Sequence, residues 1–99
     1  MPYGIEFSPE AEDHLGRLAA RRRALVLDSV DRHLMHQPEA ETRNRKRLQP
    51  NPIAEWELRL SDLRVYRDVE TDPEPVVLVR AVGVKQRNVV RIGGVVIPL

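Results

Sequence analysis

Two arginines, Arg59 and Arg64, have a spacing that indicates specific chemistry. They lie within residues 56–69, where apolar and polar residues alternate on both sides of the dipeptide Ser61-Asp62. Such alternation around a short polar turn is typical of a β-hairpin. With this dipeptide as the loop, the two arginines face each other on a charged face, and a shift of one residue would mix the charged and apolar faces. Facing like charges cost up to about 1 kcal/mol unless an anion lies between them, so the pair indicates an anion-binding site.

Two helices are expected before the hairpin. A short alternating strand, residues 3–7, leads into Ser8-Pro9, a typical helix start with an N-cap serine and an early proline. A second, antiparallel helix is expected to end before Pro38. Both helices are expected to pack on the apolar face of the hairpin and to leave its charged face open. The residues assigned to this contact are Leu15, Leu18, Leu27, Val30 and Leu34 from the helices and Leu58, Leu60, Leu63 and Val65 from the hairpin.

The sheet is expected to continue after the hairpin. Residues 76–84 are nearly all apolar, as in a central strand that is covered on both faces, and residues 89–92 form a further short strand. Residues 39–54 show no periodicity and are expected to form a loop. The sequence therefore predicts a single α+β domain over residues 1–99, with two N-terminal antiparallel helices packed on one face of a mainly antiparallel four- to five-stranded sheet.

The composition excludes several kinds of site. The 99 residues contain no cysteine, which excludes disulfides and thiolate zinc sites and fits a reducing compartment. The formal net charge of +1 does not by itself indicate a nucleic-acid partner. The histidines, His14, His33 and His36, have no partners at metal-ligand spacing and are expected to be exposed on helices. With no leader pattern and no apolar run of membrane-spanning length, we expect a cytoplasmic protein that has no metal, no small-molecule cofactor and no membrane partner.

Several short motifs follow one another along the chain. They are Tyr3-x-Ile5-x-Phe7-Ser8-x-x-Ala11, the helix pair, Asn44-Arg45-Lys46-x-Leu48, Trp56-Glu57-Leu58-Arg59-x-x-Asp62-x-Arg64-Val65 and Ala81-Val82-Gly83-x-Lys85-x-Arg87. In this order and spacing, over nearly the whole chain, they resemble the RelE/ParE superfamily of toxins from type II toxin-antitoxin systems. The resemblance implies a RelE-like fold and a cognate antitoxin protein as partner. RelE-like members are implied to be mRNA endonucleases that act on the ribosome, whereas ParE-like members inhibit DNA gyrase.

The resemblance also implies roles for individual residues. Arg64 matches an arginine that RelE-like enzymes use on the scissile phosphate, Arg59 matches a basic position on the preceding strand, and Lys85 matches a position that is basic in active members. Two positions depart from the family pattern, because Glu57 stands where the prototype has a catalytic lysine and Arg91 stands where it has a tyrosine. A C-terminal histidine of some relatives is also missing. These departures concern proton transfer rather than the fold.

Cleavage of RNA by its own 2′-OH requires cations around the phosphate, a base and a proton donor. Arg59, Arg64 and Lys85 are the candidate cations. Glu57 is the candidate base, because an arginine stays protonated and Glu57 shares a face with Arg59. A role for Glu57 as a surface salt-bridge partner fits the sequence equally well. The candidate RNA-binding residues are Arg45, Lys46, Arg47, Arg87 and Arg91.

Three functions remain open on the sequence. The first is a ribosome-dependent mRNA interferase, whose partners are the antitoxin and mRNA on the ribosome. The second is a ParE-like inhibitor of gyrase that cleaves nothing, and the third is a toxin-fold module that only binds other proteins. The arginine pair beside a glutamate favours the first. In each case we expect the antitoxin to cover or displace the apolar residues 95–99.

Overall fold

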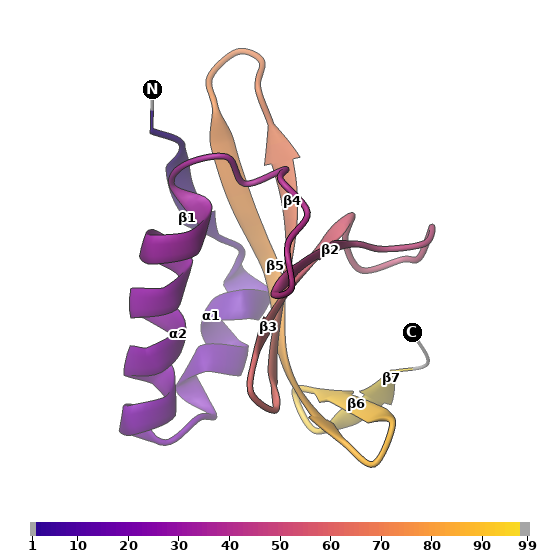
Figure 1. The fold of residues 1–99 in the computed structure, drawn as a ribbon. Helices are drawn as coiled ribbons and strands as arrows, with labels where there is room; N and C mark the ends of the chain where they lie inside the picture. The colour runs from indigo at the N-terminus through magenta and orange to yellow at the C-terminus, as the bar shows by residue number, and fades with distance from the viewer. Residues whose placement is uncertain (1, 98–99) are drawn as a thin grey trace.

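The structure, a computed structural model, describes residues 2–97 and has two helices packed against one face of a sheet (Figure 1). The elements in chain order are β1 (Gly4–Phe7), α1 (Pro9–Gly16), α2 (Ala20–Leu34), β2 (Arg45–Arg47), β3 (Trp56–Leu60), β4 (Leu63–Glu70), β5 (Val76–Gln86), β6 (Val89–Ile92) and β7 (Val95–Ile97).

The predicted α+β class and the mainly antiparallel sheet are confirmed. The strand order is β2-β3-β4-β5-β6-β7, and β1 pairs with β5 in parallel. The predicted number of four to five strands is wrong, because the described residues form a seven-stranded sheet. The prediction missed β2, in the segment expected to be a loop, and β7, in the apolar segment near the C-terminus. Each has only three residues, which is too short for an alternating pattern to be recognised.

The β3–β4 hairpin has the predicted register. Arg59 pairs with Arg64, and Leu58 pairs with Val65. Ser61 adopts a φ of 58°, the left-handed conformation that tight hairpin turns favour. Leu58 and Val65 are fully buried in the core beneath the helices. Since side chains alternate along a strand, the two arginines project from the other face of the sheet, as predicted.

Helix α1 begins at the predicted cap. The Ser8 hydroxyl accepts a hydrogen bond from the Ala11 N–H at 3.1 Å, which satisfies one of the free donors of the first turn. Ala11 and Leu15, one turn apart, are buried against the sheet, and Leu18 packs on the same core after the helix has ended. Neither α1 nor α2, the two helices of residues 2–97, is long and apolar enough to cross a membrane.

Helix α2 presents a different stripe from the one predicted. Val26, Val30 and Leu34 are completely buried, at intervals of four residues. The prediction that Leu27 faces the core is wrong, because this side chain lies about 100° around the helix from Val26 and is 41% exposed. The helix therefore packs along positions 26, 30 and 34 and turns the neighbouring leucine toward solvent.

The sheet face away from the helices is not fully open, so this part of the prediction is wrong. Strands β6 and β7 lie on that side of the sheet (Figure 1), and a second buried cluster forms there. Its buried members come from three strands and the segment before β3, which are too far apart in sequence for the hairpin pattern to show their contact. Its buried members are Ala54, Tyr66, Ala81, Val90 and Ile92.

One edge of β5 is shared between two strands. The first part of this edge pairs with β1 and the last part pairs with β6. In the interval, the Ser8 hydroxyl donates to the Arg80 carbonyl at 3.1 Å, and the Val82 N–H donates to Nδ1 of His14 at 3.2 Å. Side chains from around α1 thus supply the backbone hydrogen bonds that no strand makes there.

The contact with Val82 requires a neutral His14, because a protonated imidazole has no free acceptor. The expectation that His14 is an exposed helix residue is wrong, since its side chain is half-buried between α1 and the sheet. Burial lowers the pKa of His14 from its ordinary value of 6.5, against a smaller opposite effect of the Asp13 carboxylate. The unfolded chain therefore takes up more protons than the folded one as the pH falls below 6.5.

We predict that the free energy of unfolding decreases below pH 6.5 and that His14→Gln weakens this dependence. Glutamine keeps an acceptor near the Val82 N–H but does not titrate. The measurement is urea denaturation at several values between about pH 7.5 and pH 5, across the ordinary titration range of histidine. His36→Gln is the matched control, because it makes the same substitution at an exposed position outside both buried clusters. Identical pH dependence in His14→Gln and wild type would contradict the prediction.

Candidate functional site

The candidate site is a hollow of about 460 Å³ on the sheet face away from the helices. Glu57, Arg59 and Lys85, from the set of predicted catalytic residues, line it together with Tyr66. Strands β3, β4 and β5 thus bring side chains distant in sequence to one place. The remaining lining residues, which are mainly apolar, are Leu48, Asn88, Val89, Val90, Val96 and Ile97.

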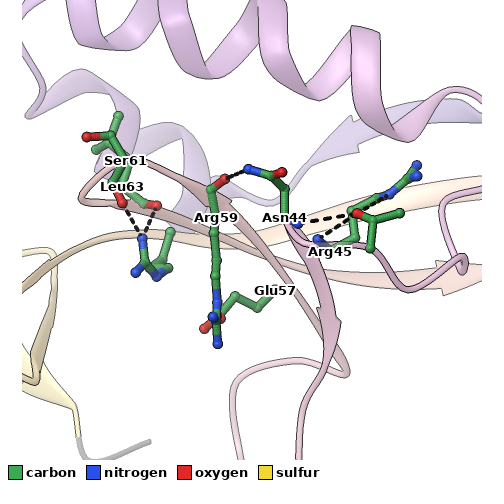
Figure 2. A network of polar contacts seen from close by, with 8 residues as sticks. Asn44, Arg45, Glu57, Arg59, Ser61 and Leu63 are labelled. Carbon is green, nitrogen blue, oxygen red and sulfur yellow. Dashed lines mark hydrogen bonds and ion pairs between the residues drawn. The ribbon is translucent and has the colours of Figure 1, made fainter.

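Glu57 and Arg59 form an ion pair in this hollow. Arg59 Nε donates to Glu57 Oε1 at 2.6 Å, and Figure 2 shows the two side chains side by side. The Glu57 side chain is only 10% exposed, whereas that of Arg59 is 46% exposed. A carboxylate with so little contact to water depends on its protein partner. Arg59 therefore neutralises the buried carboxylate of Glu57 while part of its own side chain stays in contact with solvent.

The backbone of Arg59 is fixed by the segment before β2. Asn44 Nδ2 donates to the Arg59 carbonyl at 3.0 Å (Figure 2), and the Arg59 N–H donates to the Asn44 carbonyl at 2.7 Å. These two bonds continue the β2–β3 pairing toward the hairpin turn. The cation of the hollow thus projects from a residue whose N–H and C=O are both bonded to Asn44, opposite Arg64 of β4.

Arg64 lies on the same face, directly across from Arg59, but it binds its own turn. Its Nη1 donates to the carbonyl oxygens of Ser61 at 2.7 Å and Leu63 at 2.9 Å. The facing arginines therefore have different acceptors, a carboxylate for one and turn carbonyls for the other, which offsets their repulsion. To contact an anion in the hollow, the Arg64 side chain must leave the turn.

Tyr66 was not singled out from the sequence, although the predicted register already placed it opposite Glu57. Its side chain is completely buried, and its phenol oxygen has no hydrogen-bond partner in the described part of the chain. Burial, together with the nearby Glu57 carboxylate, raises the pKa of Tyr66 to about 12. The phenol is therefore a permanent donor at neutral pH, lying beside the hollow without an acceptor.

The three basic residues of β2 have separate surroundings. Lys46 pairs with Glu57 and so lies on the face of the hollow. Arg45 lies on the helix side, where its Nη1 donates to the His33 carbonyl at the end of α2 at 2.8 Å. The guanidinium of Arg47 lies 5.5 Å from the centre of the tryptophan ring of β3. Of the predicted RNA-binding residues in this strand, Lys46 alone lies on the side of Glu57 and Arg59.

Arg87 and Arg91 are directed elsewhere. Arg87 is exposed in the turn between β5 and β6, with a φ of 51°. Arg91 pairs with Val84, which packs against the core under the helices, so alternation places Arg91 on the face opposite to the hollow. Both arginines line a separate hollow of about 530 Å³. The structure therefore does not bring these two predicted RNA-binding residues to Glu57 and Arg59.

A buried arginine, Arg67, was also missed by the sequence analysis. Arg67 follows Tyr66 on β4 and faces the helix side, and both side chains are fully buried because both faces of the sheet are covered there. Arg67 Nη2 donates to the Pro38 carbonyl at 2.7 Å, and its guanidinium lies 5.4 Å from the centre of the Trp56 ring. Burial lowers the pKa of Arg67 to about 10. Arg67 thus connects β4 to the segment after α2 and is not part of the hollow.

The arrangement of two helices on a mainly antiparallel sheet also occurs among solved structures. A chain in the crystal structure of the toxin-antitoxin complex RelBE2 from Mycobacterium tuberculosis superimposes with a TM-score of 0.73 and 22% sequence identity, over 86% of this chain and 93% of that chain. At this level of identity the likeness shows a common fold. No protein-family model matches the sequence, and no curated protein matches it.

Gly83 lies at the junction of three strands beside the hollow. It pairs with Arg64 on β4 and with Ile92 on β6. A Cβ atom at this position would lie 2.9 Å from Ile92 Cγ1 and 3.0 Å from the Arg91 carbonyl oxygen. The absence of a side chain thus allows β6 to pack closely against β5 and to form one wall of the hollow.

We predict that Gly83→Ala lowers the free energy of unfolding by about 1–3 kcal/mol, because the added methyl group forces β6 to shift. Urea denaturation measures the change. Gly16→Ala is the matched control, since no atom lies within 4 Å of a Cβ at that position, at the end of α1. We expect it to be neutral or stabilising by up to about 1 kcal/mol. A Gly83→Ala variant as stable as wild type would contradict the close packing of β6.

Proposed function

We propose that the chain is the toxin of a type II toxin-antitoxin system and that it cleaves mRNA on the ribosome as a RelE-like endoribonuclease. The observation that carries the proposal is the hollow in which Glu57 lies beside Arg59 and Lys85. The common fold with a chain of a toxin-antitoxin complex supports the toxin part of the proposal. Such a protein would act in the cytoplasm, where its substrate is translated.

The proposed reaction is attack by a ribose 2′-OH on the adjacent phosphorus. The bond from O2′ to phosphorus forms, the bond from phosphorus to O5′ breaks, and the 2′-OH proton passes to the Glu57 carboxylate. Water returns a proton to the O5′ leaving group. Arg59, Lys85 and, once released from its turn, Arg64 offset the charge that develops on the phosphoryl oxygens. Lys46, across from Glu57, supplies a further cation for the RNA backbone.

A phosphate that enters the hollow competes with Glu57 for Arg59. In the free protein this guanidinium is engaged by the carboxylate at 2.6 Å. Bidentate binding of a phosphate by arginine is strong and geometrically specific. Substrate binding in this scheme therefore weakens the ion pair and leaves the Glu57 carboxylate free to accept a proton.

Gyrase inhibition of the ParE type is the second candidate function. It is favoured by Glu57, which stands where the RelE prototype has a catalytic lysine, and by the hydrogen bonds of Arg64 to its own turn. A module that only binds other proteins is the third candidate. Induction of the protein alone, followed by measurement of translation, DNA supercoiling and replication, separates the three.

We predict that Arg64→Ala lowers the rate of mRNA cleavage on translating ribosomes by about two to three decades. A preorganised cation at a phosphoryl transition state contributes about 3–4 kcal/mol. The fold should persist, because Arg64 is not part of either buried cluster. Arg32→Ala is the matched control, since Arg32 is 64% exposed on α2 and pairs only with Asp28, at 3.2 Å, in residues 2–97.

If wild type and Arg64→Ala are both toxic and neither produces cleaved mRNA, the nuclease proposal fails. Altered supercoiling in the same cells would then make gyrase inhibition the leading function.

The antitoxin is proposed to bind over β7. Val95 and Val96 are 60% and 49% exposed, and β7 pairs only with β6 among the described strands. An exposed apolar strand at a sheet edge suits an added strand or an amphipathic helix of a partner. Residues 98 and 99 of the segment named in the sequence analysis lie outside the described residues.

We predict that Val96→Asp lowers the affinity for the cognate antitoxin by about tenfold or more, because it places a charge in an apolar interface. Titration calorimetry with the product of the adjacent small gene measures the change. Leu25→Asp is the matched control, since Leu25 is 43% exposed on α2, in the layer on the other side of the sheet. If Leu25→Asp lowers the affinity and Val96→Asp does not, the antitoxin covers the helices instead.

A further inference from the structure

The phenol oxygen of Tyr66 is the starting point of the inference. It is buried, and none of the described residues offers it a hydrogen bond. A buried hydroxyl without a partner destabilises a protein, whereas phenylalanine would fill the same space without this cost. The oxygen thus contributes nothing favourable to the free protein, which points to an acceptor in another state of the molecule.

The Glu57 carboxylate is a candidate for that acceptor. Glu57 and Tyr66 pair directly across β3 and β4, and their side chains leave the sheet on the same face. Both line the hollow. A carboxylate accepts several hydrogen bonds, and within residues 2–97 Glu57 has one side-chain donor, Arg59 Nε.

We propose that Tyr66 is a positioning residue for Glu57, and that the carboxylate exchanges Arg59 for the Tyr66 hydroxyl when a phosphate group binds in the hollow. The inference rests on the proposed function, because it takes Glu57 as the base and the RNA phosphate as the group that draws Arg59 away. The exchange leaves no buried carboxylate without a donor. It also holds the carboxylate in place, without its ion-pair partner, at the moment when the 2′-OH must lose its proton.

The hydrogen bond between Tyr66 and Glu57 would exist only in the bound state. An interaction of this kind increases the rate of the reaction without stabilising the free protein. This separates it from an ordinary packing role, in which loss of the side chain would lower stability and activity together.

Single-turnover cleavage of mRNA on ribosomes tests the first consequence. We expect Tyr66→Phe to be as stable as wild type or more stable, and to cleave about tenfold or more slowly, as for loss of a hydrogen bond to a charged group. Because Tyr66 acts through Glu57, the double variant Tyr66→Phe/Glu57→Gln should cleave at the rate of Glu57→Gln alone. Tyr3→Phe is the matched control, since Tyr3 packs against the core under the helices. Wild-type cleavage by Tyr66→Phe would overturn the inference and leave the proposed function intact.

A second measurement does not depend on cleavage. The chain has two tyrosines, so protein labelled with ¹³C at tyrosine Cζ gives two resonances. We expect the Tyr66 resonance to shift on addition of inorganic phosphate, to be shifted already in Arg59→Ala without phosphate, and to return in Arg59→Ala/Glu57→Gln. The Tyr3 resonance should stay unchanged throughout.

The two experiments fail in different ways. If wild type never cleaves mRNA, the proposed function fails, and the resonance of Tyr66 in Arg59→Ala decides the inference by itself. A shift that disappears in Arg59→Ala/Glu57→Gln supports the exchange, and no shift in Arg59→Ala overturns it.

Discussion

The division of one edge of β5 between β1 and β6 is the constraint on which the rest of the molecule depends. The other edge of β5 pairs with β4 along the whole length of β4, residues 63–70. The switch from β1 to β6 leaves backbone groups near Arg80 and Val82 without a strand partner, and Ser8 and His14 bind them. Strand β1, on the first part of this edge, packs on the core under the helices. Strand β6, on the last part, forms a wall of the hollow. Side chains around α1 thus help to hold together the two halves of the sheet.

The parts of the fold that could be predicted depend on short stretches of sequence. The register of β3 and β4 follows from the alternation around Ser61-Asp62, and the start of α1 follows from Ser8-Pro9, because turns and caps are local. The missed parts depend on distant partners. The bulge at Arg80 of β5 arises from its pairing with β4, whose register shifts between Tyr66 and Arg67, and no pattern within β5 specifies it.

The candidate site was predictable to the extent that it lies on the hairpin. Alternation alone places Glu57 and Arg59 on one face, whereas the approach of Lys85 depends on the pairing of β5 with β4 and β6. The sequence also grouped the arginines around Lys46 as one basic patch. Neighbouring positions on a strand point to opposite faces, so Arg45 binds the end of α2 while Lys46 faces the hollow. Consecutive basic residues in a strand therefore lie on two different surfaces of the sheet.

The two walls of the hollow are attached to the protein by different means. On one side, Arg45 and Arg67 donate to carbonyl oxygens at and just after the end of α2, which fastens β2 and β4 to the helix layer. On the other side, β7 is held through β6 alone among the described strands. The hollow can therefore widen by movement of β7 while the spacing between Lys46 and Arg59 is preserved. For the proposed function this means that RNA would enter past β7 and reach first Lys46, while Arg59 is still paired with Glu57.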